Sequence, residues 1–153
     1  MKKLAMVLVF MAVNARAQEV APCRYDGDNA YLSSIGVVAE PWEENTRLFA
    51  DGAVRLVVID TEEPAFAAVH LAVLMWGKAE IGLEARVCFL VSFGSAGFYD
   101  ANLAGMQTSY SPAAGLVLTV PVSRYDPALD QAVVAPLELI INRQSNTVKA
   151  RLQ

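Results

Sequence analysis

The feature that most constrains this fold is an alternating run in the middle of the chain, residues 85–93. Every second residue of the run is large and apolar, in the series Val87, Phe89, Val91 and Phe93. Side chains of a β-strand point alternately to its two faces, so this period of two predicts a strand with one wholly apolar face. We expect it to be an interior strand of a sheet that covers a packed core.

Other short segments with strand character follow one another along the chain. The clearest pair, 47–50 and 53–59, flanks Asp51-Gly52, a dipeptide suited to the positive φ angles of a two-residue hairpin turn. We expect further strands over 31–39, 107–110, 116–120, 137–141 and 147–151. Pro121 is predicted to break the strand over 116–120 or to place its end at a sheet edge. Residues 18–29 are predicted to be an irregular polar arm, and 124–131 a polar loop.

Residues 62–76 are compatible with two structures. Asp60 or Thr61 would cap a helix that Gly77 ends. The same segment alternates as a strand does, and a short run that is apolar on both faces cannot be assigned by periodicity. We favour the strand, and therefore predict an all-β fold, an antiparallel β-sandwich or small barrel of about eight short strands. The alternative is an α+β fold with one helix at 62–76.

The first 17 residues have the composition of a cleaved signal peptide. Lys2 and Lys3 precede an apolar run over 4–13, and Ala15 and Ala17 supply the small residues that a signal peptidase reads. The run is much shorter than the roughly 20 residues of a membrane-spanning helix. We therefore expect cleavage after Ala17, no stable membrane insertion afterwards, and one domain over 18–153 that is periplasmic or secreted.

The charge of the chain bears on its partners. The formal net charge is −4, and removal of Lys2, Lys3 and Arg16 with the signal peptide would change it to −7, since no acidic residue leaves with them. Nucleic acids and anionic membrane surfaces attract basic patches, so neither is expected as a partner.

The chain contains two cysteines, Cys23 and Cys88. Two cysteines in an exported protein are typically joined in a disulfide. A Cys23–Cys88 bridge would tie the N-terminal arm to the alternating run of 85–93.

Most common catalytic motifs are absent from the sequence. His70 is the only histidine and lies in an apolar run, where a hydrogen-bonded core residue is the expected role. Residues 94–97 lack the G-x-S-x-G spacing of a nucleophile elbow. One histidine and two bridged cysteines do not supply the usual zinc ligands. The Asp and Asn residues of 25–29 begin like a calcium loop but lack its later ligands, and no phosphate-binding glycine motif is present. We expect no cofactor and no metal.

A carboxylate-dependent hydrolase remains an alternative, because such an enzyme needs only two acidic side chains. The adjacent pairs Glu43-Glu44 and Glu62-Glu63 are unsuited to it, since neighbouring residues of an extended chain point in opposite directions. A catalytic pair would have to come from two different loops.

Two binding functions are compatible with the sequence. Trp42, Trp76, Tyr99 and Tyr110 lie in or beside predicted loops, and Asp100 and Asn102 lie close to two of them. These rings would stack on sugars in a glycan-binding module, or would instead close the ends of the core. Our leading hypothesis is a non-catalytic domain that binds another envelope or secreted protein, through an exposed strand edge with unpaired backbone groups.

Overall fold

A computed structural model of the chain describes residues 18–23, 30–63, 67–78, 82–94 and 96–153. The predicted signal peptide over 1–17 and the Asp- and Asn-containing segment over 25–29 lie outside these residues. Within the described ranges, no helix has the length and apolar character needed to cross a membrane.

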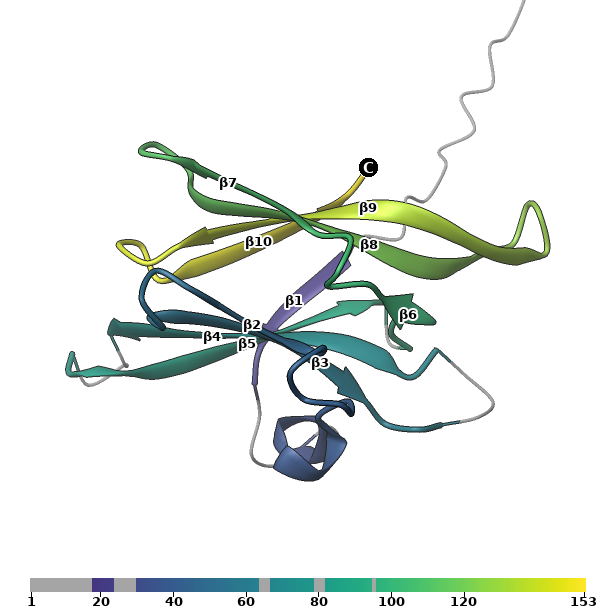
Figure 1. The fold of residues 1–153 in the computed structure, drawn as a ribbon, viewed down its shortest axis with the longest axis horizontal. Coiled ribbons are helices and arrows are strands. Elements are labelled where there is room, and N and C mark those ends of the chain that lie inside the picture. Colours follow the sequence, from purple (N-terminus) through teal and green to yellow (C-terminus); the bar gives the residue numbers. More distant parts are fainter. Residues whose placement is uncertain (1–17, 24–29, 64–66, 79–81, 95) are drawn as a thin grey trace, which may run out of the picture.

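The described residues form two antiparallel five-stranded sheets that are stacked face to face (Figure 1). The first sheet has the order β1-β5-β4-β3-β2, and its strands are β1 Gln18–Pro22, β2 Thr46–Phe49, β3 Val54–Asp60, β4 Val69–Lys78 and β5 Glu84–Phe93. The second has the order β10-β9-β8-β6, with β7 also paired to β8; its strands are β6 Asp100–Ala101, β7 Gln107–Ser111, β8 Gly115–Asp126, β9 Gln131–Asn142 and β10 Thr147–Leu152. The sheets do not close into a barrel, so the predicted β-sandwich is confirmed, with ten strands instead of eight.

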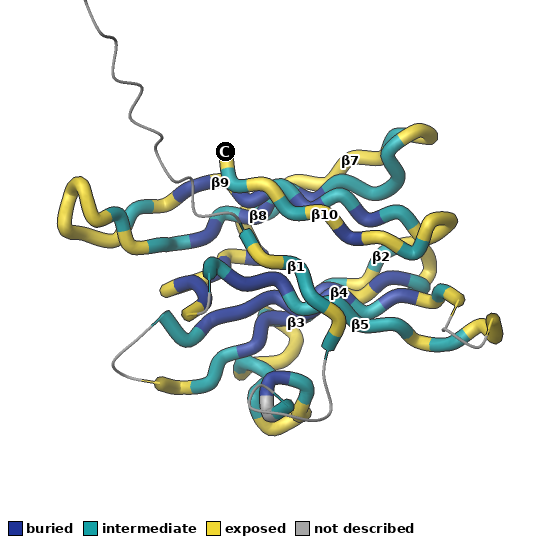
Figure 2. The backbone as a smooth tube through the Cα atoms, turned by 180° about the vertical axis from the view of Figure 1, so that it is seen from behind, coloured by how far each residue is buried: buried dark blue, intermediate teal, exposed yellow. Residues whose placement is uncertain are grey.

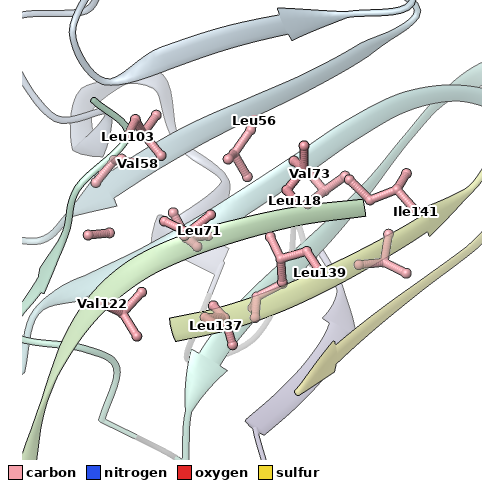
Figure 3. Packing of buried hydrophobic residues seen from close by; sticks show 14 of the residues in the cluster. Leu56, Val58, Leu71, Val73, Leu103, Leu118, Val122, Leu137, Leu139 and Ile141 are labelled. Atoms are coloured by element: carbon pink, nitrogen blue, oxygen red, sulfur yellow. The ribbon is translucent and has the colours of Figure 1, made fainter. Parts of the chain in front are cut away.

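The main core lies between the two sheets (Figure 3). Alternate residues of β3 and β4 face alternate residues of β8 and β9, and those without solvent exposure include Leu56, Leu71, Val73, Met75, Leu118, Leu137 and Leu139. The alternating run of β5 supplies Val91, which is fully buried, and three partly buried residues beside it. Shortening one of these leucines to alanine would lower the free energy of unfolding by about 2–5 kcal/mol.

Residues 69–78 form the central strand β4, so the alternative helix at 62–76 is wrong. β4 pairs with β3 on one side and β5 on the other. Its inner residues, such as Leu71 and Val73, enter the main core. Ala72 faces outward and is also buried, which explains why the run is apolar on both faces.

The outer face of the first sheet is covered by two short 3₁₀ helices, η1 Ala30–Ser33 and η2 Ile35–Val37. The strand predicted over 31–39 is therefore wrong, and only Val38 makes an isolated β-bridge, to Ile59. Ser34 caps η2 by accepting a hydrogen bond of 3.2 Å from the Gly36 amide. Leu32 packs with Ile59 and other outward residues in a second, smaller core, against which Val37 and Val38 also lie.

Two prolines lie opposite each other inside the hairpin of β8 and β9, so the expectation that Pro121 ends a strand is wrong. Pro121 pairs in register with Pro136, and β8 continues to Asp126. The Pro121 carbonyl accepts a hydrogen bond from the Asn102 amide, and the Pro136 carbonyl accepts one from the Gln153 amide. Both carbonyls therefore point away from the partner proline. In an antiparallel ladder every second residue pair exchanges no hydrogen bonds. Prolines at such a pair remove no hydrogen bond between the two strands, although they have no N–H group. The predicted loop over 124–131 is correspondingly shorter, since only residues 127–130 lie between the strands.

The hairpin at Asp51-Gly52 is confirmed, but its loop is longer than two residues. Phe49 pairs with Val54, and residues 50–53 lie between them. Ala50, Asp51 and Gly52 have φ angles of 51°, 54° and 80°. The chain therefore reverses through a four-residue loop with three consecutive positive φ angles, in place of the predicted two-residue turn.

The predicted Cys23–Cys88 disulfide is present, with a Cα–Cα distance of 5.2 Å. Residues 18–22 are not the irregular arm that was predicted, because they form β1 and pair with Phe89 to Phe93 of β5. The Cys23 amide continues this ladder with a hydrogen bond of 2.9 Å to the Cys88 carbonyl. The disulfide therefore fixes the end of an edge strand of only five residues.

Loss of the disulfide should destabilise the fold without changing its architecture. The bridged cysteines are 65 residues apart, and a loop of that length corresponds to about 4 kcal/mol of chain entropy removed from the unfolded state. We expect the double variant Cys23→Ser/Cys88→Ser to unfold in urea with a free energy lower by an amount of that order. Reduction of the unaltered protein should reproduce the loss, whereas an unchanged midpoint in both would show that the bridge contributes nothing.

Candidate functional site

The four aromatic side chains predicted for binding are all partly exposed. Trp42, Trp76, Tyr99 and Tyr110 have exposed fractions of 48%, 44%, 46% and 73%. Trp42 and Trp76 are about half covered, so their exposure alone does not distinguish binding from the alternative role of closing an end of the core. Their exposure is compatible with binding, and their arrangement decides between the two binding hypotheses.

The rings are divided between the two ends of the sandwich. Trp42 lines a cavity together with Asp60, the last residue of β3. Tyr99 is at the same end, because the preceding Phe98 forms a β-bridge to Val69, the partner of Asp60 in β4. Trp76 lies at the other end of β3, where its amide donates to the Ala53 carbonyl. Tyr110 is also at this second end. It pairs with Leu116 of β8, which pairs with Ile141 near the end of β9. In the turn that follows β9, the Asn146 side chain donates a hydrogen bond to the Lys78 carbonyl at the end of β4. The four rings therefore do not form one face for a glycan.

The polar residues expected beside the rings are engaged locally. The Asp100 carboxylate accepts a hydrogen bond of 2.8 Å from the Ala101 amide. The Asn102 side-chain oxygen accepts one of 3.0 Å from the Gly105 amide. Both side chains are exposed, but their main contacts stabilise the chain around β6.

The face of the Trp76 ring is covered by a cation. Arg86 is the cross-strand partner of Trp76, and its guanidinium carbon lies 4.7 Å from the indole centroid. Arg86 also donates to the Gly52 carbonyl at 3.2 Å, which holds it in place. The face that Arg86 covers is not free to stack on a sugar.

His70 and Ser92 form a buried polar pair on the outer face of the first sheet. Their exposed fractions are 5% and 8%, and His70 Nδ1 lies 2.8 Å from Ser92 Oγ. Gly97 lies against the imidazole, since a Cβ added there would come within 2.9 Å of Cε1. Burial lowers the pKa of His70, and the negative charge of Asp60 opposes this shift only in part. The two side chains are hydrogen-bonded to each other within the fold, which is the role predicted for a lone histidine in an apolar run.

The two acidic pairs considered in the sequence have different surroundings. Glu43 and Glu44 are exposed, and their backbone carbonyls accept hydrogen bonds from Arg47. Glu62 lines the cavity beside Trp42, together with Asp60 and Glu40. This gathering of acidic side chains from two segments was missed, because it depends on the bridge between Val38 and Ile59 that replaces the predicted strand.

The edges of the two sheets differ in how they are protected. At one side of the sandwich β1 and β10 lie beside each other (Figure 2), and they carry Pro22, Lys149 and Arg151. At the other side β2 has four residues, and its Arg47 donates to the Thr46 carbonyl at 2.8 Å. β6 is two residues long and includes Asp100. Charges, prolines and short length are the usual devices that prevent pairing with a foreign strand.

The edge strand β7 is as short as β1, with five residues, but it carries neither a charge nor a proline. Its sequence is Gln107-Thr108-Ser109-Tyr110-Ser111, without charge or proline, and its first four residues are exposed. Thr108 and Tyr110 pair with Leu118 and Leu116, so their side chains lie on the face that covers the core. The signal for this strand was present in the sequence as an uncharged run of five residues, but its edge position was not.

Searches of protein-family models, of curated proteins and of solved structures found no match to this chain.

The burial of His70 predicts a specific dependence of stability on pH. An unfolded histidine titrates near pH 6.5, whereas burial lowers the pKa of His70 in the fold. Below about pH 6.5 the unfolded chain therefore binds a proton that the folded chain does not, and the free energy of unfolding falls until the lowered pKa is reached. Urea unfolding of the purified protein at a series of pH values between neutral and mildly acidic measures this loss.

The matched control is His70→Gln, which keeps a hydrogen-bonding side chain beside Ser92 but does not titrate. The variant should lose less stability than the unaltered protein over the same pH interval. Equal losses in the two proteins would show that His70 is protonated as easily in the fold as in the unfolded chain.

Proposed function

We propose that this protein is an exported, non-catalytic β-sandwich that binds an extended segment of another envelope or secreted protein at the edge of β7. The observation that carries the proposal is the contrast between β7 and the other edge strands of the described residues. Each of the others carries at least one charged residue, whereas β7 carries none and its first four residues are exposed. An edge of this kind is a template for β-strand addition.

The hydrogen-bonding pattern identifies which groups of β7 are available to a partner. The Pro121 carbonyl of β8 points toward Asn102, so odd-numbered residues of β8 direct their backbone groups to the side of β6 and β7. Their partners in β7 are residues 107, 109 and 111. Because alternate residues of a strand direct these groups to opposite sides, Thr108 and Tyr110 present theirs at the free edge.

The composition of the bound segment follows from this geometry. A strand that pairs with β7 would place every second side chain on the core side, next to Thr108 and Tyr110. Tyr110 has an exposed fraction of 73% and offers a large apolar surface there. We therefore expect the segment to be extended and to carry apolar residues at alternate positions, flanked by polar ones.

The alternatives have less support. The glycan-binding hypothesis relied on four rings, which lie at two ends, and Arg86 covers one of them. The hydrolase hypothesis requires two carboxylates from different loops. Glu40 and Asp60 line one cavity in this way, but no observation there identifies one of them as a general acid and the other as a nucleophile or base. Export rests on the composition of residues 1–17, and the Cys23–Cys88 disulfide is compatible with an oxidising compartment.

Removal of one backbone donor should abolish binding at β7. Thr108→Pro deletes an outward N–H group without removing a hydrogen bond to β8, and an edge strand tolerates proline at such a position. A photo-crosslinking residue in place of Ser109, in cells that export the protein, should give a discrete crosslinked product that Thr108→Pro reduces by at least about tenfold, as expected for a central contact.

Two controls accompany this experiment. Thr108→Val changes the same side chain but keeps the N–H group, and it should leave the crosslinked product intact. The same crosslinker in place of Lys149 on β10 should give no such product. Equal crosslinking by the Pro and Val variants would overturn the proposal, because the bound segment would then not pair with the β7 backbone.

A further inference from the structure

A second surface lies away from β7, at the end of the sandwich where β3 ends. We propose that the cavity between η2 and residues 60–62 binds an organic ammonium group, as carried by a polyamine or a lysine side chain. The cavity measures about 380 Å³, within the range of roughly 300–1,000 Å³ that is usual for small-molecule sites. This inference does not rest on the function proposed for β7.

The walls of the cavity come from two segments held in a fixed relation. The Val38–Ile59 bridge and a hydrogen bond of 3.0 Å from the Ala39 amide to the Val58 carbonyl join the residues after η2 to β3. On one side this places Glu40, and on the other Asp60 and Glu62. The Asp60 carboxylate accepts a hydrogen bond of 2.8 Å from the Glu62 amide, which positions both acidic residues.

The charge of the cavity has one sign. Glu40, Asp60 and Glu62 are acidic, and no lining residue is basic. The nearby Arg47 is directed elsewhere, since it donates to backbone carbonyls at 2.8 to 3.0 Å. Like charges that line one cavity repel one another, and a bound cation relieves this repulsion whereas a neutral sugar does not.

The ligand is larger than a metal ion. Among the residues that the structure describes, no three acidic, histidine or cysteine side chains are close enough to coordinate one ion. The carboxylates are instead distributed around the cavity. This arrangement suits a molecule whose positive charge is spread along a chain or whose ammonium group is joined to methylene groups.

The remaining lining residues match the two parts of such a ligand. Trp42 provides an indole face, which attracts ammonium groups through its quadrupole. Val38 and Ala39 provide apolar surface for methylene groups. The chain already places a cation on its other tryptophan, Trp76, whereas in the described residues no cation lies over the ring of Trp42.

The test uses the intrinsic fluorescence of Trp42. The variant Trp76→Phe leaves Trp42 as the sole tryptophan, and its emission is followed during titration with spermidine and, separately, with hexane-1,6-diol. We expect saturable binding of spermidine and none of the uncharged diol. Comparable binding of both would overturn the proposal, because the cavity would then recognise apolar chains regardless of charge.

Charge variants separate this site from the general acidity of the surface. In the Trp76→Phe background, Glu40→Gln/Glu62→Gln should weaken spermidine binding by at least about tenfold, because two of the three charges are removed. Glu43→Gln/Glu44→Gln removes the same two charges from exposed residues near Trp42 that do not line the cavity, and should change the affinity by less than about twofold. Equal weakening by both variants would overturn the proposal in favour of diffuse attraction.

Two further titrations identify the source of the ammonium group. A blocked peptide with one lysine that binds as tightly as spermidine would assign the site to a protein side chain, and a much weaker one would assign it to free polyamines. Saturable binding of neutral oligosaccharides in place of either cation would overturn the proposal. Thermal unfolding of each variant confirms that the fold is unchanged.

Discussion

The structure depends on the burial of both faces of the strands at the centre of the first sheet. Leu56, Leu71 and Val73 point inward and are fully buried, while Val57, Ile59 and Ala72 point outward and are buried almost as well. A sheet that is apolar on both faces cannot leave either face in water. The second sheet covers the inner face, and the 3₁₀ helices η1 and η2 cover part of the outer one. The arrangement therefore has three layers at this point, although only two of them are sheets.

The disulfide and the covering segment are consecutive in the chain. Cys23 is fixed to Cys88 in β5, and η1 begins seven residues later at Ala30. The bridge thus limits how far the covering segment can move from the face that it protects. After η2 the same segment bridges to Ile59 and turns at Pro41 to Glu44 before entering β2. The cavity beside Trp42 arises at this turn, so it is a consequence of how the outer face is covered.

Much of the fold could be predicted from the sequence, because period-two patterns and turn residues are local properties. The run of 85–93 identified β5, and the uncharged alternation over 69–75 identified β4 once a strand was preferred to a helix. The failures have a common cause. The apolar residues of 31–39 resemble a strand, but several of them pack on the outer face of a sheet. Pro121 is tolerated inside β8 because it and Pro136 form a pair that exchanges no hydrogen bonds. Both depend on neighbours that are distant in sequence.

The functional surfaces were harder to predict than the fold for a related reason. A single aromatic residue or acidic pair is visible in the sequence, but a site requires residues from separate segments. Trp42 was recognised, whereas Glu40 and Asp60 gained significance only when the Val38–Ile59 bridge brought the two segments together. In the same way, the five residues of β7 are unremarkable until the other edges are compared with them. What distinguishes β7 is the lack of a protective charge or proline at an edge, and that is a property of the whole sheet arrangement. Sites defined by such comparisons are found only after every edge and both faces have been accounted for.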